Sequence, residues 1–153
     1  MRLWHYALIP VLPRQQLLGQ YRECCAIAKL IFQEKGVNHM LVNKITDYPA
    51  WMWMHYQTLV TNEMRKRGYS VYAYSEITLN ENTMKAEEEG YFADDDSFPF
   101  DLNDLFPGWH TDRYLRQCYF NLQEKYDCGG ITEDEWKAIE DFVDCKNVMM
   151  YYY

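Results

Sequence analysis

The chain has 153 residues, of which 48% are hydrophobic, and a chain of this length can bury roughly 70% of its unfolded surface as one domain. No stretch approaches the ~20 consecutive apolar residues that span a bilayer, and Pro10, Pro13 and Arg14 interrupt the first segment, so we expect a cytoplasmic protein without a membrane partner. The net charge of −8 argues against a general nucleic-acid binder, whose surface is normally basic.

The charge is unevenly distributed along the chain. Residues 1–75 carry nine Lys and Arg against four Asp and Glu, whereas residues 76–104 carry one against ten. Residues 105–153 carry five against nine. An anionic ligand therefore remains compatible with the first half of the chain, and the acidic segment could repel it or compete with it.

The chain opens with a strand-like segment interrupted by prolines. A helix is predicted from Pro13 to about Glu34, because its apolar residues recur at the spacing of one buried face. These residues are Leu17, Tyr21, Cys24, Ala28 and Ile31. Gly36 is expected to end this helix.

Residues 38–44 form a short mixed stretch that could be extended or a loop. A second helix is predicted to start near Asp47 as its N-cap, with Pro49 in the first turn, where a missing N–H costs nothing. It should end at the basic run 65–67, which complements the helix dipole, followed by Gly68.

From about residue 70 to 107 the helical periodicity fails and acidic residues dominate. We expect a long acidic surface loop here, with at most a short helix. Two helices follow, at Thr111–Tyr126 and Thr132–Val143, and Thr132 with Glu135 has the spacing of a capping box. The apolar tail 147–153 should pack on the core. The expected fold is thus a mainly α single domain over 1–153, with an acidic loop insert at about 70–107.

Several polar residues of the first helix share one side. Gln16, Gln20 and Glu23 lie at i, i+4 and i+7, which is the spacing of a polar stripe, and an ordinary solvated helix face has the same pattern. Five cysteines without paired spacing indicate reduced thiols. The four histidines His5, His39, His55 and His110 have no metal-ligand spacing, so no metal site is expected.

The segment 2–25, RLWHYALIPVLPRQQLLGQYRECC, resembles the pyrimidine-dimer DNA glycosylases typified by phage endonuclease V, and especially their bacterial branch. NHMLVN at 38–43 and EMRKRGY at 63–69 are weaker matches, so the resemblance covers residues 1–69. It implies a mainly helical DNA-repair enzyme, a glycosylase and abasic-site lyase that needs no metal and no cofactor. Its partner would be damaged double-stranded DNA, bound weakly because the chain is acidic.

The resemblance also implies roles for individual residues. The α-amine of Met1 would attack the damaged nucleotide to form an imine, and Glu23 would assist as acid and base. Arg22, with Arg2 and Arg14, would contact DNA phosphates. Residues beside the reactive terminus, namely Trp4, His5, Gln16 and His39, would form the pocket.

Some residues depart from the family pattern and leave two alternatives open. Arg2 is too bulky for ordinary removal of Met1, and Gln16 and Ala26 replace a family histidine and a DNA-binding arginine. One alternative is therefore a catalytically inactive member that binds a protein partner through the acidic segment 76–104. The other is imine chemistry on a smaller nucleoside or sugar.

Overall fold

Helix α1 (Arg14–Gln33) is the longest element of the computed structural model, which describes residues 2–33 and 39–146. A 3₁₀ helix, η1 (Tyr6–Val11), precedes it, and five further helices follow. They are α2 (Met40–Thr46), α3 (Ala50–Lys66), α4 (Ala73–Glu88), α5 (Asp112–Asp127) and α6 (Glu133–Cys145). No strand forms within the described ranges, so the prediction of a mainly α single domain is confirmed.

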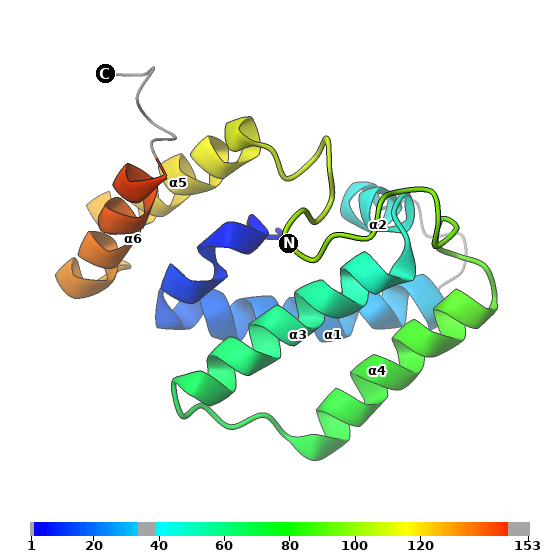
Figure 1. Cartoon of the computed structure of the whole chain (residues 1–153). Helices are drawn as coiled ribbons and strands as arrows, with labels where there is room; N and C mark the ends of the chain where they lie inside the picture. The colour runs from blue at the N-terminus through cyan, green and yellow to red at the C-terminus, as the bar shows by residue number, and fades with distance from the viewer. Residues whose placement is uncertain (1, 34–38, 147–153) are drawn as a thin grey trace.

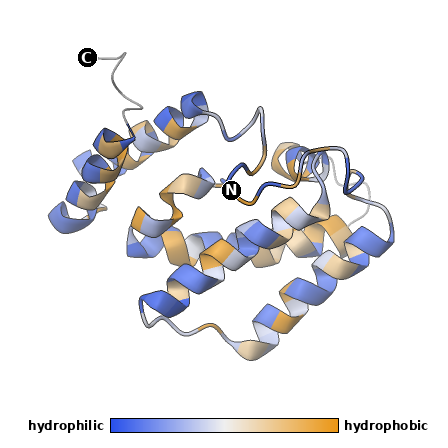
Figure 2. Ribbon diagram, in the orientation of Figure 1, coloured by the Kyte–Doolittle hydropathy of each residue, from blue (hydrophilic) through white to orange (hydrophobic). Residues whose placement is uncertain are grey.

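The helices form two groups joined by the N-terminal segment. Helix α1 packs against α3 and α4, while α5 packs against α6 (Figure 1). The 3₁₀ helix η1 contacts both α3 and α6. Hydrophobic and hydrophilic residues alternate along the same helices (Figure 2), as expected when each helix buries one side.

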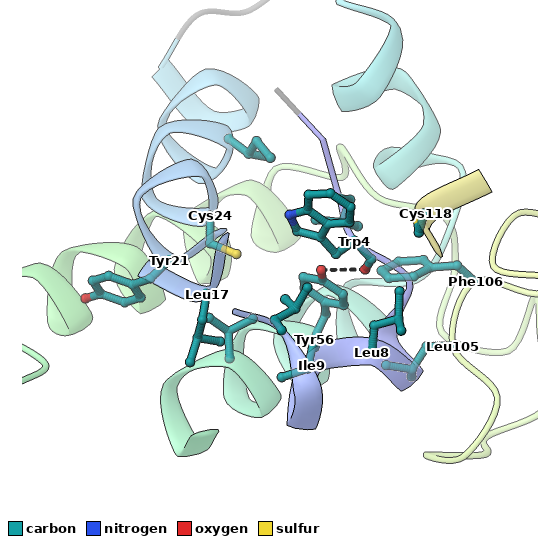
Figure 3. Packing of buried hydrophobic residues seen from close by; sticks show 14 of the residues in the cluster. Trp4, Leu8, Ile9, Leu17, Tyr21, Cys24, Tyr56, Leu105, Phe106 and Cys118 are labelled. Atoms are coloured by element: carbon teal, nitrogen blue, oxygen red, sulfur yellow. Dashed lines mark hydrogen bonds between the residues drawn. The ribbon is translucent and has the colours of Figure 1, made fainter. Parts of the chain in front are cut away.

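The N-terminal segment is part of the core. Leu3, Leu8 and Ile9 are almost fully buried, and Trp4 is 6% exposed. Figure 3 shows Trp4 among the side chains of α1 and α3, with its carbonyl accepting a hydrogen bond from the Tyr56 hydroxyl at 2.7 Å. The opening residues therefore do not form the strand-like segment that the sequence suggested, and they are fixed against α1.

The boundaries of α1, α5 and α6 agree with prediction, and the capping box of Thr132 and Glu135 is present. Of the stretch 38–44, expected to be extended or a loop, residues 40–44 instead lie in α2. Its N-cap is His39, whose Nδ1 accepts a hydrogen bond from the Leu41 N–H at 3.3 Å. Asp47 ends α2 and is not the N-cap of α3, whose N-cap is Pro49.

The prediction of a loop across 70–107 is wrong for its first part, where α4 forms. The periodicity was hidden because two of the four buried residues of α4 are polar, namely Asn82 and Thr83, while Tyr74 and Ile77 are exposed. The buried hydroxyl of Thr83 accepts hydrogen bonds from two side chains of α3. Helix α4 is thus part of the core, and the non-helical residues of this region are 70–72 and 89–111.

Among the helices that the structure describes, none is long and apolar enough to cross a membrane. The predicted packing of the tail 147–153 lies outside the described residues, as does Met1.

Candidate functional site

Glu23 on α1 contacts the start of the chain directly. The backbone N–H of Arg2 donates a hydrogen bond to Glu23 Oε2 at 3.1 Å. One turn earlier on α1, Gln20 Oε1 accepts the N–H of Trp4 at 2.8 Å and the hydroxyl of Tyr56 at 3.0 Å. Two successive contacts thus fix the N-terminal segment along α1 and hold the Glu23 carboxylate beside its first residues.

A cleft of about 390 Å³ surrounds this contact, and we call it the Glu23 cleft. Its walls are largely polar, and among the described residues that line it Trp4 is the aromatic one. The lining residues are Arg2, Trp4, Gln15, Gln16, Gly19, Gln20, Glu23, Asn121 and Lys125. The polar stripe predicted on the first helix therefore faces a cleft.

Two lining residues were missed by the sequence analysis. Asn121 and Lys125 lie one turn apart on α5 and face the α1 side of the Glu23 cleft. An i, i+4 pair of polar residues on a surface helix is also the pattern of an ordinary solvated face. Since only the packing of distant segments brings α5 opposite α1, no local signal could identify them.

The three arginines assigned to DNA differ in position. The Arg2 guanidinium lies over the Trp4 ring, 5.3 Å from its centroid, and Arg2 lines the Glu23 cleft. Arg22 is exposed next to Gly19. Arg14 lies at the start of α1, where its guanidinium covers the Tyr69 ring, and it does not line the cleft.

His5 and His39 do not line the Glu23 cleft either. His39 caps α2, and His5 is 4% exposed. His5 Nδ1 accepts the Ala7 N–H at 3.1 Å, so its Nε2–H donates to the His110 carbonyl at 3.0 Å. Burial lowers the pKa of His5 to about 4, despite the opposing effects of that hydrogen bond and of Asp112. Neither histidine is among the residues that line this cleft, and their assignment as pocket residues stays a prediction.

A second, larger cleft of about 960 Å³ lies between η1, α3, α5 and the end of α6. His5 and His110 form part of its wall, and the Tyr6 N–H donates to His110 Nδ1 at 3.1 Å. Burial, followed by the charges of His5 and Lys44, holds the pKa of His110 well below 6.5. Both imidazoles are thus neutral structural groups near neutral pH.

The thiols that lie in the interior are poor nucleophiles. Cys24 is fully buried, and burial raises its pKa well above the usual value. Burial also raises the pKa of Cys118. Thiolates are the reactive form, so neither side chain is suited to covalent catalysis. No group of three His, Cys, Asp or Glu side chains that could hold a metal occurs within 2–33 and 39–146.

Comparison with known proteins gives one result. Residues 1–74 match the family model described as pyrimidine dimer DNA glycosylase, which confirms the resemblance inferred from the sequence. None of the curated proteins and none of the solved structures matches the chain. The matched region contains the α1 wall of the Glu23 cleft and the Arg2–Glu23 contact, while the α5 wall lies outside it.

Proposed function

Because residues 1–74 match the family model of the pyrimidine dimer DNA glycosylases, we propose that the protein excises damaged pyrimidines from double-stranded DNA and then cleaves the strand as an abasic-site lyase. The observation that carries this proposal is the 3.1 Å contact between the Arg2 backbone nitrogen and Glu23 Oε2. It brings the start of the chain and a carboxylate together in one cleft, which is the pairing that amine catalysis requires.

In the proposed reaction, the neutral α-amine attacks C1′ of the damaged nucleotide and the base leaves with its bonding electrons and a proton. The nitrogen lone pair then opens the sugar ring at the C1′–O4′ bond, O4′ takes a proton from solvent, and a protonated imine is left at C1′. Glu23 then accepts a C2′ proton, and the C3′–O bond breaks to cleave the strand. An α-amine suits this chemistry because its ordinary pKa of about 7.7–8.0 leaves part of it neutral at physiological pH.

The identity of the amine follows from which residue begins the mature chain. If Met1 is kept, as the bulk of Arg2 suggests, its amine is the nucleophile and the Arg2 nitrogen is an unreactive peptide amide. If Met1 is removed, the Arg2 nitrogen becomes the α-amine. A chain that begins at Arg2 would have its α-amine at the nitrogen that lies 3.1 Å from Glu23 Oε2.

DNA would be bound by the cations near this cleft. Arg2 and Lys125 line it, and Arg22 is exposed on the adjoining turn of α1. Few phosphate contacts imply weak binding with a shallow dependence on salt. Arg14 was also expected to contact DNA. It is the first residue of α1, whereas Glu23 lies nine residues further along the helix, and Arg14 does not line the cleft.

Borohydride trapping tests the proposal. Two mass-verified preparations are compared, one beginning at Met1 and one beginning at Arg2 after specific cleavage of an N-terminal fusion. Each is incubated with a duplex carrying one abasic site and then reduced. We expect a covalent adduct on the N-terminal peptide, formed faster by the Arg2 form, and none after acetylation of the terminus.

Two outcomes would count against this account. Equal rates of trapping by both preparations would mean that the reaction does not depend on whether the amine belongs to Met1 or to Arg2. No adduct from either one, with a known lyase of the family as positive control, would overturn the lyase mechanism.

Failure of trapping would leave the two alternatives. For a smaller substrate, the same trapping is repeated with 2-deoxyribose 5-phosphate. For an interaction module, the acidic segment is altered by the triple substitution of Asp94, Asp95 and Asp96 to Asn, since these residues are exposed. Deleting residues 76–104 would be a poor test, because it removes most of the α4 core helix.

A further inference from the structure

The cleft of about 960 Å³ between η1, α3, α5 and the end of α6 takes no part in the proposed reaction, and we call it the large cleft. Apolar side chains from several segments line it, namely Ile9, Leu59, Leu102, Leu115 and Phe142. Leu102 is 43% exposed, so part of this apolar wall is left open by the described residues. The volume lies within the ~300–1,000 Å³ that is usual for ligand sites, and the large cleft is therefore a candidate binding surface.

The charged residues of the large cleft carry both signs. Lys66 and Lys146 line it together with Glu63, Asp104 and Asp112. A duplex or another polyanion would bring its phosphates close to three carboxylates, which repel them. The mixed lining instead favours an uncharged occupant whose apolar side chains have polar ends, and tyrosine is a residue of this kind.

One wall residue of the large cleft has a hydrogen-bond donor without an acceptor. His110 is 5% exposed, and its Nδ1 accepts the Tyr6 N–H at 3.1 Å. A neutral imidazole whose Nδ1 accepts carries its hydrogen on Nε2. That Nε2 is buried and has no partner among the described residues. A buried donor left unpaired is costly, so an occupant with oxygen acceptors would complement this wall.

The described part of the chain ends at the large cleft. Lys146 is its last residue, and the ammonium group lies over the Phe142 ring, 5.7 Å from the centroid. The next seven residues, the tail 147–153, read NVMMYYY and include no Asp, Glu, Lys or Arg. An extended chain spans roughly 3.3 Å per residue, so seven residues can reach ~23 Å. The tail is thus long enough to cross the cleft and has the composition that its walls favour.

We propose that the tail 147–153 occupies the large cleft of its own chain. Its apolar side chains would pack against Leu59, Leu102 and Leu115, and a backbone carbonyl or a tyrosine hydroxyl would accept a hydrogen bond from His110 Nε2–H. Because η1 and α3 line one part of the cleft and α5 and the end of α6 another, the bound tail would join the two groups of helices. This inference does not depend on the glycosylase proposal, and its tests need no DNA.

Disulfide trapping tests where the tail lies. Cys128 and Cys145 are exposed and are first replaced by Ser. Met150→Cys is then combined with Leu59→Cys in the cleft or, as the matched control, with Met54→Cys. Met54 is also a half-buried residue of α3, but it is not among the residues that line the cleft. We expect an intrachain disulfide to form roughly tenfold faster with Leu59→Cys, as measured by peptide mass mapping.

Equal rates for the two cysteine pairs would overturn the proposal, since the tail would then show no preference for the large cleft. Disulfides that form mainly between two chains, and that become rarer on dilution, would also overturn it. The occupant of the cleft would then be the tail of a second copy.

Carboxypeptidase digestion provides a second test, without introduced cysteines. A tail held in the cleft is cut only while it is released. Leu102→Asn weakens the apolar wall, and Phe120→Asn is the control at an apolar residue outside the cleft with matching exposure, 44% against 43%. Thermal unfolding establishes that both variants are folded. We expect tyrosine to be released roughly tenfold faster from Leu102→Asn than from the original protein, with Phe120→Asn unchanged.

Release from the original protein at the rate of the free peptide NVMMYYY would show that nothing holds the tail, and the proposal would fail. Equal rates for Leu102→Asn and the original protein would exclude the large cleft as the place where the tail binds.

Discussion

At the scale of single residues, the proposed chemistry depends on one carboxylate that also fixes the backbone of Arg2. Glu23→Gln should keep the contact, because the amide oxygen can still accept the Arg2 N–H. The variant cannot take the C2′ proton. We expect strand cleavage to fall by roughly 10²–10⁴-fold while duplex affinity stays nearly constant, as measured by single-turnover cleavage and equilibrium binding. Cleavage at the original rate would refute the role of Glu23.

Some candidate residues lie in the cleft as the sequence predicted, and others do not. Trp4, Gln16 and Glu23 lie in one cleft, as a short N-terminal segment beside the first helix implied. His5 and His39 do not, because each uses Nδ1 to cap the start of a helical segment. Such capping depends on the backbone conformation of one residue, which the matched sequence segments alone do not reveal.

At the scale of elements, the same contrast appears between α6 and α4. The start of α6 was predictable, because a capping box is a local arrangement of Thr132 and Glu135. Helix α4 was not, because its buried side carries Asn82 and Thr83. Helix α3 supplies two hydrogen bonds to the Thr83 hydroxyl. Periodicity of apolar residues cannot detect a helix stabilised in this way.

The packing of α4 on α3 can be tested at Thr83. Its hydroxyl accepts from Trp53 Nε1 at 3.3 Å and from Gln57 Nε2 at 2.9 Å. Thr83→Val conserves the shape of the side chain and leaves two buried donors unpaired. We expect the free energy of unfolding to fall by about 2–4 kcal/mol, measured by urea denaturation.

The matched control is Thr78→Val on the same helix. The Thr78 hydroxyl donates only to the Tyr74 carbonyl, at 2.9 Å, and the residue is partly exposed. This substitution should change stability by less than about 0.5 kcal/mol. Equal effects at the two sites would mean that the Thr83 hydrogen bonds contribute little to the α3–α4 interface.

At the scale of the whole molecule, the acidic segment and the Glu23 cleft are separate. No described residue of 76–104 lines this cleft, although the net charge of the chain is −8. Local cations can therefore contact phosphate while the overall charge weakens association. This arrangement is consistent with a weak DNA-binding enzyme and does not require the acidic segment to block the site.

The salt dependence of duplex binding measures how many cations take part. With Arg2, Arg22 and Lys125 in contact, the slope of log K against log salt should be roughly −3. Lys125→Gln should reduce its magnitude by about 1, whereas Lys137→Gln, on exposed surface of α6, should leave it unchanged. An unchanged slope in Lys125→Gln would remove α5 from the proposed DNA interface.

The stability of the fold should depend on pH through the two buried histidines. The pKa of His5 is lowered from 6.5 to about 4, chiefly by burial, and burial likewise holds the pKa of His110 well below 6.5. The unfolded chain therefore binds more protons than the folded chain as pH falls below about 6.5. Their contribution to stability is complete above that pH and is lost as the pH falls toward the folded pKa values.

Between pH 7.5 and pH 5, His5 alone should lower the free energy of unfolding by about 2 kcal/mol. Glu135 does not contribute in this window. Its pKa lies below 4.5, because the hydrogen bonds from Arg14 and Thr132 outweigh its partial burial, so its effect appears only at lower pH. Denaturant titrations at several pH values in His5→Gln should show a flatter profile, and His55→Gln provides the comparison at a half-exposed histidine. If the free energy of unfolding depends on pH in the same way in the original protein and in His5→Gln, then His5 does not cause the loss of stability in acid.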